Sequence, residues 1–302
     1  MENLFSDRYK YKRKIYLNPE EVTDSLKKRI YNLVEKCLEN PELFELHYEN
    51  EFGSKIKIRG KNRDKLIEIL WDEFFKEDIQ VLRERYKLQR WAVIVESEFL
   101  DKYSIKAIRD KYYELKEWYL IYDFIEFIIN RFNPNERFIS LLNNVFKAEG
   151  APYRVIGKYV APSISEVEVN ELEQALNIPD KYESVRTHIS QALRHFSQKP
   201  NPDYKNSIKE SILGLESLLK IILNTPKGTL GELVNKLSVH PALKEALKKL
   251  YGWTSDEDGI RHAKPGEKTT SSEEEARFLL VISSAFVNYI ISKYEKQLTK
   301  EN

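Results

Sequence analysis

The stretch YKNSIKESILGLESLLKIIL, residues 204–223, decides the fold of the second half of this chain. Its apolar residues recur every three or four positions, which is the period of an α-helix with one buried face. That face carries Ile208, Ile212, Leu215, Leu219 and Ile222. Asp203 occupies the position of a helix N-cap, and Pro226 ends the pattern. The stretch therefore predicts a helix that packs one face into a bundle.

Helical patterns surround this stretch on both sides. Residues 182–198 have the same periodicity, and the sequence KPNPDY separates them from the helix above. A further helix is expected to begin with Pro241 at its first position and to end at Gly252. Ser272 and Glu275 have capping-box spacing, which predicts a last helix over 273–296. The second half of the chain is thus expected to be a helical bundle with one long loop.

The first half is also expected to be helical, with a short β-hairpin. Asn18, followed by Pro and two Glu, indicates a helix start, and 99–132 reads as a pair of core helices. The two β-favouring runs in 153–164 flank Gly157-Lys158, which suits a type II′ hairpin. Residues 55–59 are ambiguous between a short strand and an extended arm. We place a domain boundary at the interrupted pattern that follows, giving domains 1–178 and 179–302.

Composition limits the possible partners and compartments. The 302 residues carry 49 Lys plus Arg and 48 Asp plus Glu, so the net charge of +1 gives no bulk attraction to nucleic acid or lipid. The single Cys37 lies on an apolar helical stripe, where it reads as a small core residue. We expect a cytoplasmic protein with no membrane span, because neither a signal peptide nor a long uncharged apolar run is seen. The basic aromatic run at 8–14 reads either as a solvated arm or as an RNA contact.

The segment TSDEDGIRHAKPGEKTT, residues 254–270, stands out in the long loop of the bundle. Arg261 and His262 are adjacent there, behind an acidic run that ends in Asp258 and Gly259. A histidine that titrates near neutral pH can take a proton from a 2′-hydroxyl, and a guanidinium fork can bind two phosphoryl oxygens. The same residues could instead form a structural turn with a local ion pair.

Several stretches of the chain resemble a known family. Residues 5–34 and 152–176 resemble the opening and the closing hairpin-plus-helix of the N-terminal domain of AbiJ-type bacterial abortive-infection proteins. The stretches NPDYKNSIKESILGLESLL, TLGELVNKL and HPALKEALKKLYGWTSDEDGIRHA resemble the C-terminal domain of the same proteins, which is placed among HEPN domains.

The resemblance implies a function. HEPN domains are helical bundles that usually dimerise, and many are metal-independent ribonucleases of defence systems. Their active site at the dimer interface uses an Arg and a His, typically about four to six residues apart. This chain departs from that spacing, because Arg261 and His262 are adjacent. The pair is therefore either a variant of the active site or the remnant of one.

Two acids are candidates for supporting roles. Asp258 could orient His262 or raise its pKa, but it could equally cap a helix or pair with Arg261. Glu216 lies at the border of the apolar face of 204–223, where it reads as a buried partner for Arg261 or as a surface acid. Glu210 is expected to be solvated. His188 and His195 can share a helix face, but without acids at ligand spacing they make a weak metal site.

Together these observations predict a phage-defence protein with a metal-independent HEPN-type endoribonuclease domain that leaves a 2′,3′-cyclic phosphate. The alternative is a non-catalytic HEPN-like dimerisation or regulatory module that binds RNA, a nucleotide or a protein partner. No cofactor and no metal are expected. The expected partners are an RNA substrate, a second copy through the apolar helix 276–291, and an antitoxin or phage trigger. The N-terminal domain is expected to sense, dock or restrain.

Overall fold

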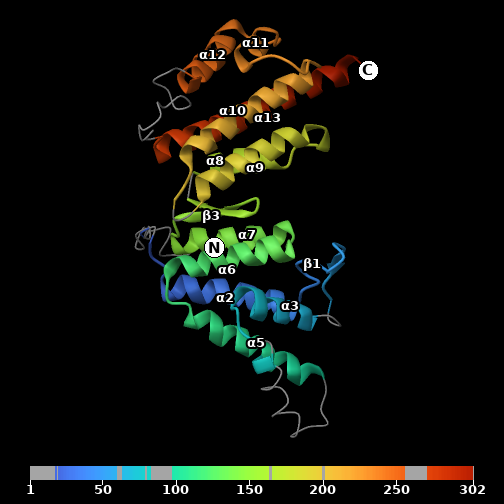
Figure 1. Ribbon diagram of the computed structural model, residues 1–302, viewed down its shortest axis with the longest axis vertical. Coiled ribbons are helices and arrows are strands. Elements are labelled where there is room, and N and C mark those ends of the chain that lie inside the picture. Colours follow the sequence, from blue (N-terminus) through green and yellow to red (C-terminus); the bar gives the residue numbers. More distant parts are fainter. Residues whose placement is uncertain are drawn as a thin grey trace, which may run out of the picture. The chain divides into compact units, whose positions relative to one another are not determined.

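The computed structural model of the chain describes residues 18, 20–59, 63–78, 80–82, 97–162, 165–198, 201–255 and 271–301. The chain divides into two compact units, residues 1–163 and residues 164–302. Both units are mostly helical, and the strands form two small antiparallel hairpins (Figure 1). The expected mostly α fold is therefore confirmed.

The first unit holds helices around an aromatic core, with one hairpin near its beginning and one at its end. Its elements in chain order are α2 (Asp24–Glu39), β1 (His47–Glu49), β2 (Lys55–Lys57), α3 (Arg63–Ile69), η2 (Leu70–Phe74), α5 (Ser97–Glu114), α6 (Trp118–Phe132), α7 (Glu136–Glu149), β3 (Tyr153–Ile156) and β4 (Tyr159–Pro162). The ambiguous stretch at 55–59 is thus partly a strand, because Lys55–Lys57 pair antiparallel with β1.

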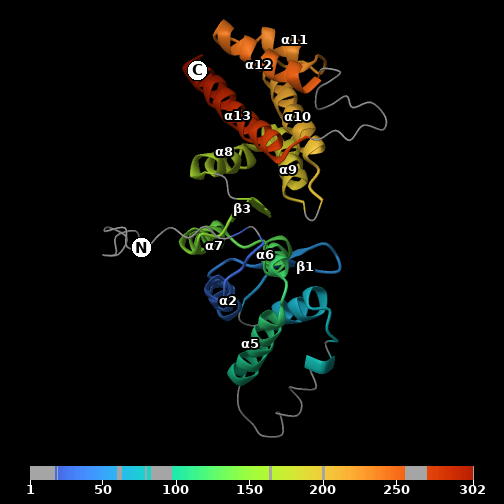
Figure 2. The ribbon, with the colours of Figure 1, turned by 90° about the vertical axis from the view of Figure 1, so that its left-hand side faces the viewer.

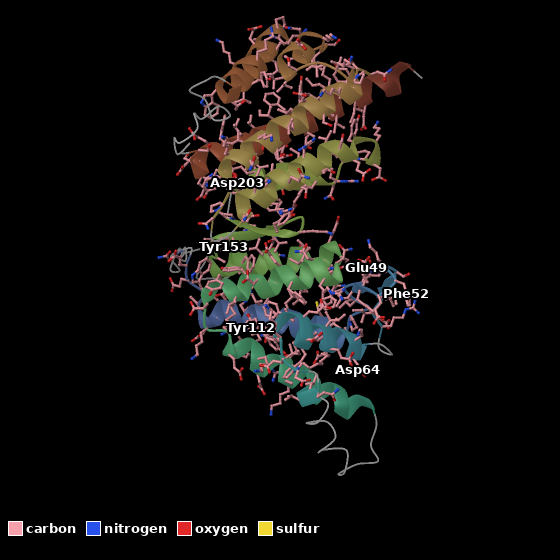
Figure 3. The ribbon with its side chains drawn as sticks, viewed as in Figure 1. Glu49, Phe52, Asp64, Tyr112, Tyr153 and Asp203 are labelled. Atoms are coloured by element: carbon pink, nitrogen blue, oxygen red, sulfur yellow. The ribbon has the colours of Figure 1, made fainter. Side chains whose placement is uncertain are left out.

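Helix α2 lies in the centre of this unit and packs against α3, α5 and α7. The hydroxyl of Tyr112, labelled in Figure 3, donates to the carbonyl of Lys27 at 3.0 Å. The Lys27 ammonium donates in turn to the carbonyl of Leu115 at 2.6 Å, just beyond the end of α5, where free carbonyls favour a cation. Cys37 is buried on α2, and burial raises the pKa of its thiol, as expected for a core residue.

The start of α2 differs from the expectation. The predicted cap Asn18 instead accepts a hydrogen bond from the backbone N–H of Glu20 at 3.3 Å, within a turn. The helix begins at Asp24, and its cap is Thr23, whose hydroxyl accepts from the N–H of Leu26 at 3.2 Å. The prediction was wrong because an Asn side chain can satisfy a local turn as readily as a helix end.

The hairpin β3–β4 has the expected two-residue turn. Gly157 has a φ of 57°, and Lys158 is not among the described residues with positive φ, as a type II′ turn requires. At both outer edges of the hairpin, side chains of helices form hydrogen bonds with backbone groups of the strands. The amide of Asn143 on α7 bonds both the N–H and the carbonyl of Val155, and the carboxylate of Glu126 on α6 accepts from the N–H of Val160.

The second unit is a helical bundle. Its elements are α8 (Glu166–Leu176), η3 (Asp180–Tyr182), α9 (Glu183–Ser197), α10 (Tyr204–Ile222), α11 (Leu230–Asn235), α12 (Pro241–Ser255) and α13 (Glu273–Glu301). Helix α10 is central and packs against α9, α11 and α13; its run beside α13 is visible in Figure 1 and Figure 2. The apolar face predicted for α10 is the face that enters the core.

One helix end in this unit differs from the expected position. Helix α12 continues past Gly252 to Ser255, and Thr254 is fully buried, so packing extends the helix beyond a residue that usually ends one. Helix α8 packs against α13, and the amide of Asn288 donates to the carbonyl and the carboxylate of Glu171. As a packing unit, α8 belongs with the bundle, whereas the boundary after residue 178 was placed where the sequence pattern is interrupted. The predicted boundary between domains 1–178 and 179–302 is a different division from that into compact units.

Candidate functional site

Three of the four predicted site residues lie outside the described part of the chain. Asp258, Arg261 and His262 fall within residues 256–270. The structure describes the chain up to Ser255 at the end of α12 and again from Ser271, just before α13. The roles of the three residues therefore stay predictions, and the described surroundings define the frame to which their segment is attached.

The described chain resumes at a capped helix start. The hydroxyl of Ser272 accepts from the N–H of Glu275 at 3.2 Å, and the Glu275 carboxylate accepts from the N–H of Ser272 at 2.9 Å. This is the capping box that the sequence predicted. The hydroxyl of Tyr204, the first residue of α10, donates to the Glu273 carboxylate at 3.4 Å, so the first turns of α10 and α13 meet. Burial, together with Glu273, raises the pKa of Tyr204 to about 12.

Asp203 caps α10 at the same end of the bundle (Figure 3). Its carboxylate accepts from the backbone N–H of Asn206 at 3.0 Å and from the Asn206 amide at 2.7 Å. Burial by itself would raise the pKa of Asp203, but these two hydrogen bonds, with the nearby His195, hold it below its ordinary value. The carboxylate is 4.0 Å from Nδ1 of His195, which lies in the last turn of α9. The expected N-cap is therefore confirmed, and it joins the ends of two helices.

Glu216 is the predicted site residue that the structure does describe. Its side chain is 18% exposed, and its carboxylate accepts from Nζ of Lys220, one turn further along α10, at 2.6 Å. The acid is thus partly buried and paired within its own helix. A contact between Glu216 and Arg261 stays a prediction.

A second acid of α10 was misjudged from the sequence. Glu210 is not solvated: its side chain is 15% exposed, and its carboxylate lies 2.7 Å from Nδ1 of His188 on α9. The signal that could have found this pair is the antiparallel turn between the two helices, because His188 and Glu210 are equally far from residue 199. Ser184 and Ser217 form a second contact between the two helices, and their hydroxyls are 2.7 Å apart.

The two helices approach closely at this seam. A Cβ placed on Gly214 would lie 3.1 Å from Cδ1 of Ile189 and 3.6 Å from Cβ of His188. The absence of a side chain at Gly214 therefore allows the distance at which Glu210 reaches the His188 ring. Among the described residues, no group of three or more His, Cys, Asp or Glu side chains could hold a metal ion.

Large apolar side chains are exposed on α12 and α13. Phe278 is 51% exposed, Tyr289 is 44% exposed, and Trp253 on α12 is 39% exposed. The rings of Trp253 and Phe278 are in contact, with their centroids 6.4 Å apart. Phe278 and Tyr289 are eleven positions apart, which is close to three helical turns, so they lie on one face of α13. We call Trp253, Phe278 and Tyr289 the aromatic face.

The opposite side of α13 is buried in the bundle. Within the described residues, the part of this helix at 273–295 is long and apolar enough to cross a membrane by length and composition. It packs against α8, α9 and α10, and its buried residues Val287, Ile290 and Ile291 belong to the core of the second unit. This packing is typical of a core helix.

The fold and the frame of the site together define a class of protein: a mostly helical chain with a compact N-terminal unit and a C-terminal bundle interrupted by a polar segment. The family described as AbiJ N-terminal domain 4 matches residues 3–177. The chain belongs to this family, and its N-terminal half is a domain of abortive-infection, phage-defence proteins. Searches of curated proteins and of solved structures found no match to the chain.

Proposed function

We propose that this protein is a cytoplasmic phage-defence ribonuclease whose C-terminal bundle is a HEPN-type domain that cleaves RNA without a metal. The observation that carries the proposal is the family match over residues 3–177, which places the chain among abortive-infection proteins. Its support is the bundle that follows, in which an Arg–His pair stands between two helices, as the HEPN resemblance implies. An antitoxin or a phage trigger would control the activity, and the N-terminal domain would sense that antitoxin or trigger.

In this proposal His262 takes the proton of the 2′-hydroxyl, and Arg261 binds the phosphoryl oxygens of the transition state. Asp258 orients His262, and Glu216 acts from α10 on the same site. The attacking 2′-oxygen displaces the 5′-oxygen, so the products are a 2′,3′-cyclic phosphate and a 5′-hydroxyl. The four residues are assigned by their chemistry and by the resemblance.

The test is cleavage of RNA in EDTA by the purified full-length protein. Wild type should cut, and His262→Ala should slow cleavage by about 10²–10⁴-fold, the usual contribution of a general base. Arg261→Lys should also be poorly active, because an ammonium keeps the charge but loses the bidentate fork. Thermal melting of the same samples separates lost chemistry from lost folding. If both variants cut as well as wild type, the assignment of the site is wrong.

The adjacency of Arg261 and His262 favours a second candidate function. HEPN sites typically separate the two residues, so this pair could belong to a non-catalytic module that binds RNA, a nucleotide or a protein partner. Such a module would bind RNA in a mobility-shift assay. It would not cleave RNA, either in EDTA or with added metal. Arg261→Lys would then be tolerated, and His262→Ala would change the melting temperature rather than an activity.

We also propose that the chain forms a homodimer through the aromatic face. Monomers rarely leave several large apolar side chains together on their surface, and Phe278 is half exposed beside Trp253. Phe278→Asp should shift the mass measured by light scattering at micromolar concentration from dimer to monomer. Val167→Asp is the matched control, because Val167 on α8 is 70% exposed and lies outside the aromatic face. A wild-type monomer would contradict this proposal.

A further inference from the structure

Helices α11 and α12 carry a local excess of positive charge. Residues 227–255, which include both helices, contain five Lys and two Glu, so their formal charge is +3, whereas the whole chain has +1. The two helices pack against each other and lie side by side in Figure 1 and Figure 2. A local field of this kind attracts a polyanion even when the molecule as a whole is nearly neutral.

Four of these lysines form one surface, which we call the lysine surface: Lys236, Lys244, Lys248 and Lys249. Nζ of Lys244 donates to the carbonyl of Asn235, the last residue of α11, at 2.9 Å, so Lys236 and Lys244 come from adjacent points of the two helices. Lys248 follows Lys244 by four positions, one turn further along the same row of α12, and Lys249 is next to it. The positive charges thus run from the end of α11 along α12.

The two acids of α11 and α12 do not neutralise the lysine surface. The carboxylate of Glu232 belongs to the capping box at the start of α11. Glu245 accepts from Nζ of Lys248 at 2.8 Å, and this hydrogen bond, together with the charges of Lys248 and Lys249, lowers the pKa of the Glu245 carboxyl group. Within the described part of the chain, neither Lys236 nor Lys249 forms an ion pair. Their ammonium groups are therefore available to an external anion.

A glycine beside the lysine surface leaves an open space. Gly252 lies inside α12, where glycine lowers stability relative to alanine. Apart from its chain neighbours and the backbone of its own helix, a Cβ placed on Gly252 would meet no atom of the described chain within 4 Å, so packing does not require this glycine. Gly252 follows Lys248 by four positions, on the same row of the helix. A glycine in this position lets a ligand approach the helix backbone closely.

We propose that the lysine surface binds the sugar–phosphate backbone of single-stranded RNA and that Gly252 is the point of closest approach. Ammonium groups placed in a row across two helices fit an extended chain of phosphates better than a single anion. The choice of RNA among polyanions rests on the proposed ribonuclease function, whereas the surface itself consists only of residues of α11 and α12. The lysines hold the RNA in place and take no part in bond breaking.

Fluorescence anisotropy with a labelled 2′-O-methyl RNA tests the proposal on the full-length protein in EDTA. This RNA lacks the 2′-hydroxyl group that a metal-independent ribonuclease uses, so binding is measured whether or not the protein cleaves RNA. Lys236→Gln and Lys249→Gln should each weaken binding roughly tenfold at about 50 mM salt and reduce the slope of log affinity against log salt by about 0.7. Lys209→Gln is the matched control, because Lys209 is exposed on α10, outside the lysine surface, and this variant should bind like wild type.

Gly252→Ala separates binding from folding. It should raise the protection of α12 amides against hydrogen exchange, because alanine favours the helix, and yet it should weaken RNA binding several-fold, because the new methyl group occupies the open space. Gly231→Ala on α11 is the control. Its Cβ would lie 3.8 Å from the ring of Tyr251, which is an ordinary contact, so this variant should bind RNA like wild type. A purely structural effect would change stability and binding in the same direction.

Other outcomes overturn the proposal. Lysine variants that bind the RNA as tightly as wild type show that RNA does not bind at the lysine surface, and a Gly252→Ala variant that binds normally shows that the RNA does not approach there. A wild type that binds phosphatidylserine vesicles or polyglutamate but not this RNA shows that the surface takes another polyanion. The failure of the proposed function looks different: wild type then binds the 2′-O-methyl RNA through these lysines but cleaves no ordinary RNA in EDTA, and the lysine surface stands without the ribonuclease.

Discussion

Replacing Gly214 by alanine tests how tightly α9 and α10 pack at the seam. The new Cβ would lie 3.1 Å from Cδ1 of Ile189, whereas its other neighbours, Cγ1 of Ile189 and Cβ of His188, would be at ordinary contact distances of 3.5 and 3.6 Å. Ile189 is fully buried, so its terminal methyl group has little room to move away. One methyl group therefore decides whether the substitution is tolerated.

Two effects of known size oppose each other. Alanine in place of glycine inside a helix gains roughly 0.8–1 kcal/mol of stability, because the unfolded backbone loses freedom. Overpacking of a buried contact costs roughly 1–3 kcal/mol. We therefore expect Gly214→Ala to destabilise the bundle by about 0–2 kcal/mol, whereas helix propensity alone predicts a gain in stability.

Ile189→Val is the matched partner for this substitution, because it removes the Cδ1 methyl group and leaves the rest of the side chain. Alone it should cost roughly 0.5–1.5 kcal/mol. In the double variant the close contact is gone and the helix gain remains, so the stability should return to within about 1 kcal/mol of wild type. The two substitutions should thus be coupled by roughly 1–3 kcal/mol.

The assay is hydrogen exchange of α9 and α10 amides, which reports the opening free energy of this unit rather than of the whole chain. A local readout is needed because a chain with two compact units need not unfold in one step. If Gly214→Ala protects these amides better than wild type, the Ile189 methyl group is free to move and the reasoning is wrong. If the stability changes of Gly214→Ala and Ile189→Val add within about 0.5 kcal/mol, the Ile189 methyl group is not what opposes the new Cβ.

Three further predictions concern the first unit. Burial raises the pKa of the Glu126 carboxyl group above its ordinary value of 4.5. The stability that the protonated carboxyl group contributes is therefore present below pH 4.5 and is lost as the pH rises through the pKa of the folded state. Glu126→Gln, which keeps an acceptor for the Val160 N–H, should melt at a higher temperature than wild type at neutral pH, and the difference should vanish toward pH 4.5. Asn143→Ala leaves the N–H and carbonyl of Val155 without their partner and should lower stability by roughly 1–3 kcal/mol in urea unfolding; no change would mean that water replaces the amide. Cys37, buried with a raised thiol pKa, should resist iodoacetamide until the protein unfolds, and rapid alkylation of the native protein would contradict its place in the core.

The sequence predicted helices wherever a local signal and an apolar period agreed. The capping box predicted at Ser272 is present, and Asp203 caps α10. These features depend on residues within one turn of each other, so their partners are adjacent in the sequence. The start of α2 was missed because the side chain of Asn18 satisfies a local turn, and Thr23 caps the helix instead.

The candidate site was predicted in part. Arg261 and His262 were singled out because they are adjacent in an irregular segment, and their roles rest on chemistry and on the family resemblance. Glu216 was placed correctly at the border of an apolar face, and its partner in the structure is Lys220. The pairing of His188 with Glu210 was missed, because a helical wheel of α10 alone places Glu210 toward solvent.

The sequence by itself determined the mostly helical fold and the identity of most helices. Apolar spacing and caps decide these features locally, whatever the neighbouring elements do. Only the tertiary structure decided that Glu210 is buried against a histidine, that α8 packs with the bundle and that α12 runs past Gly252. Each of these depends on which surface covers the residue, and that surface comes from a helix distant in the sequence.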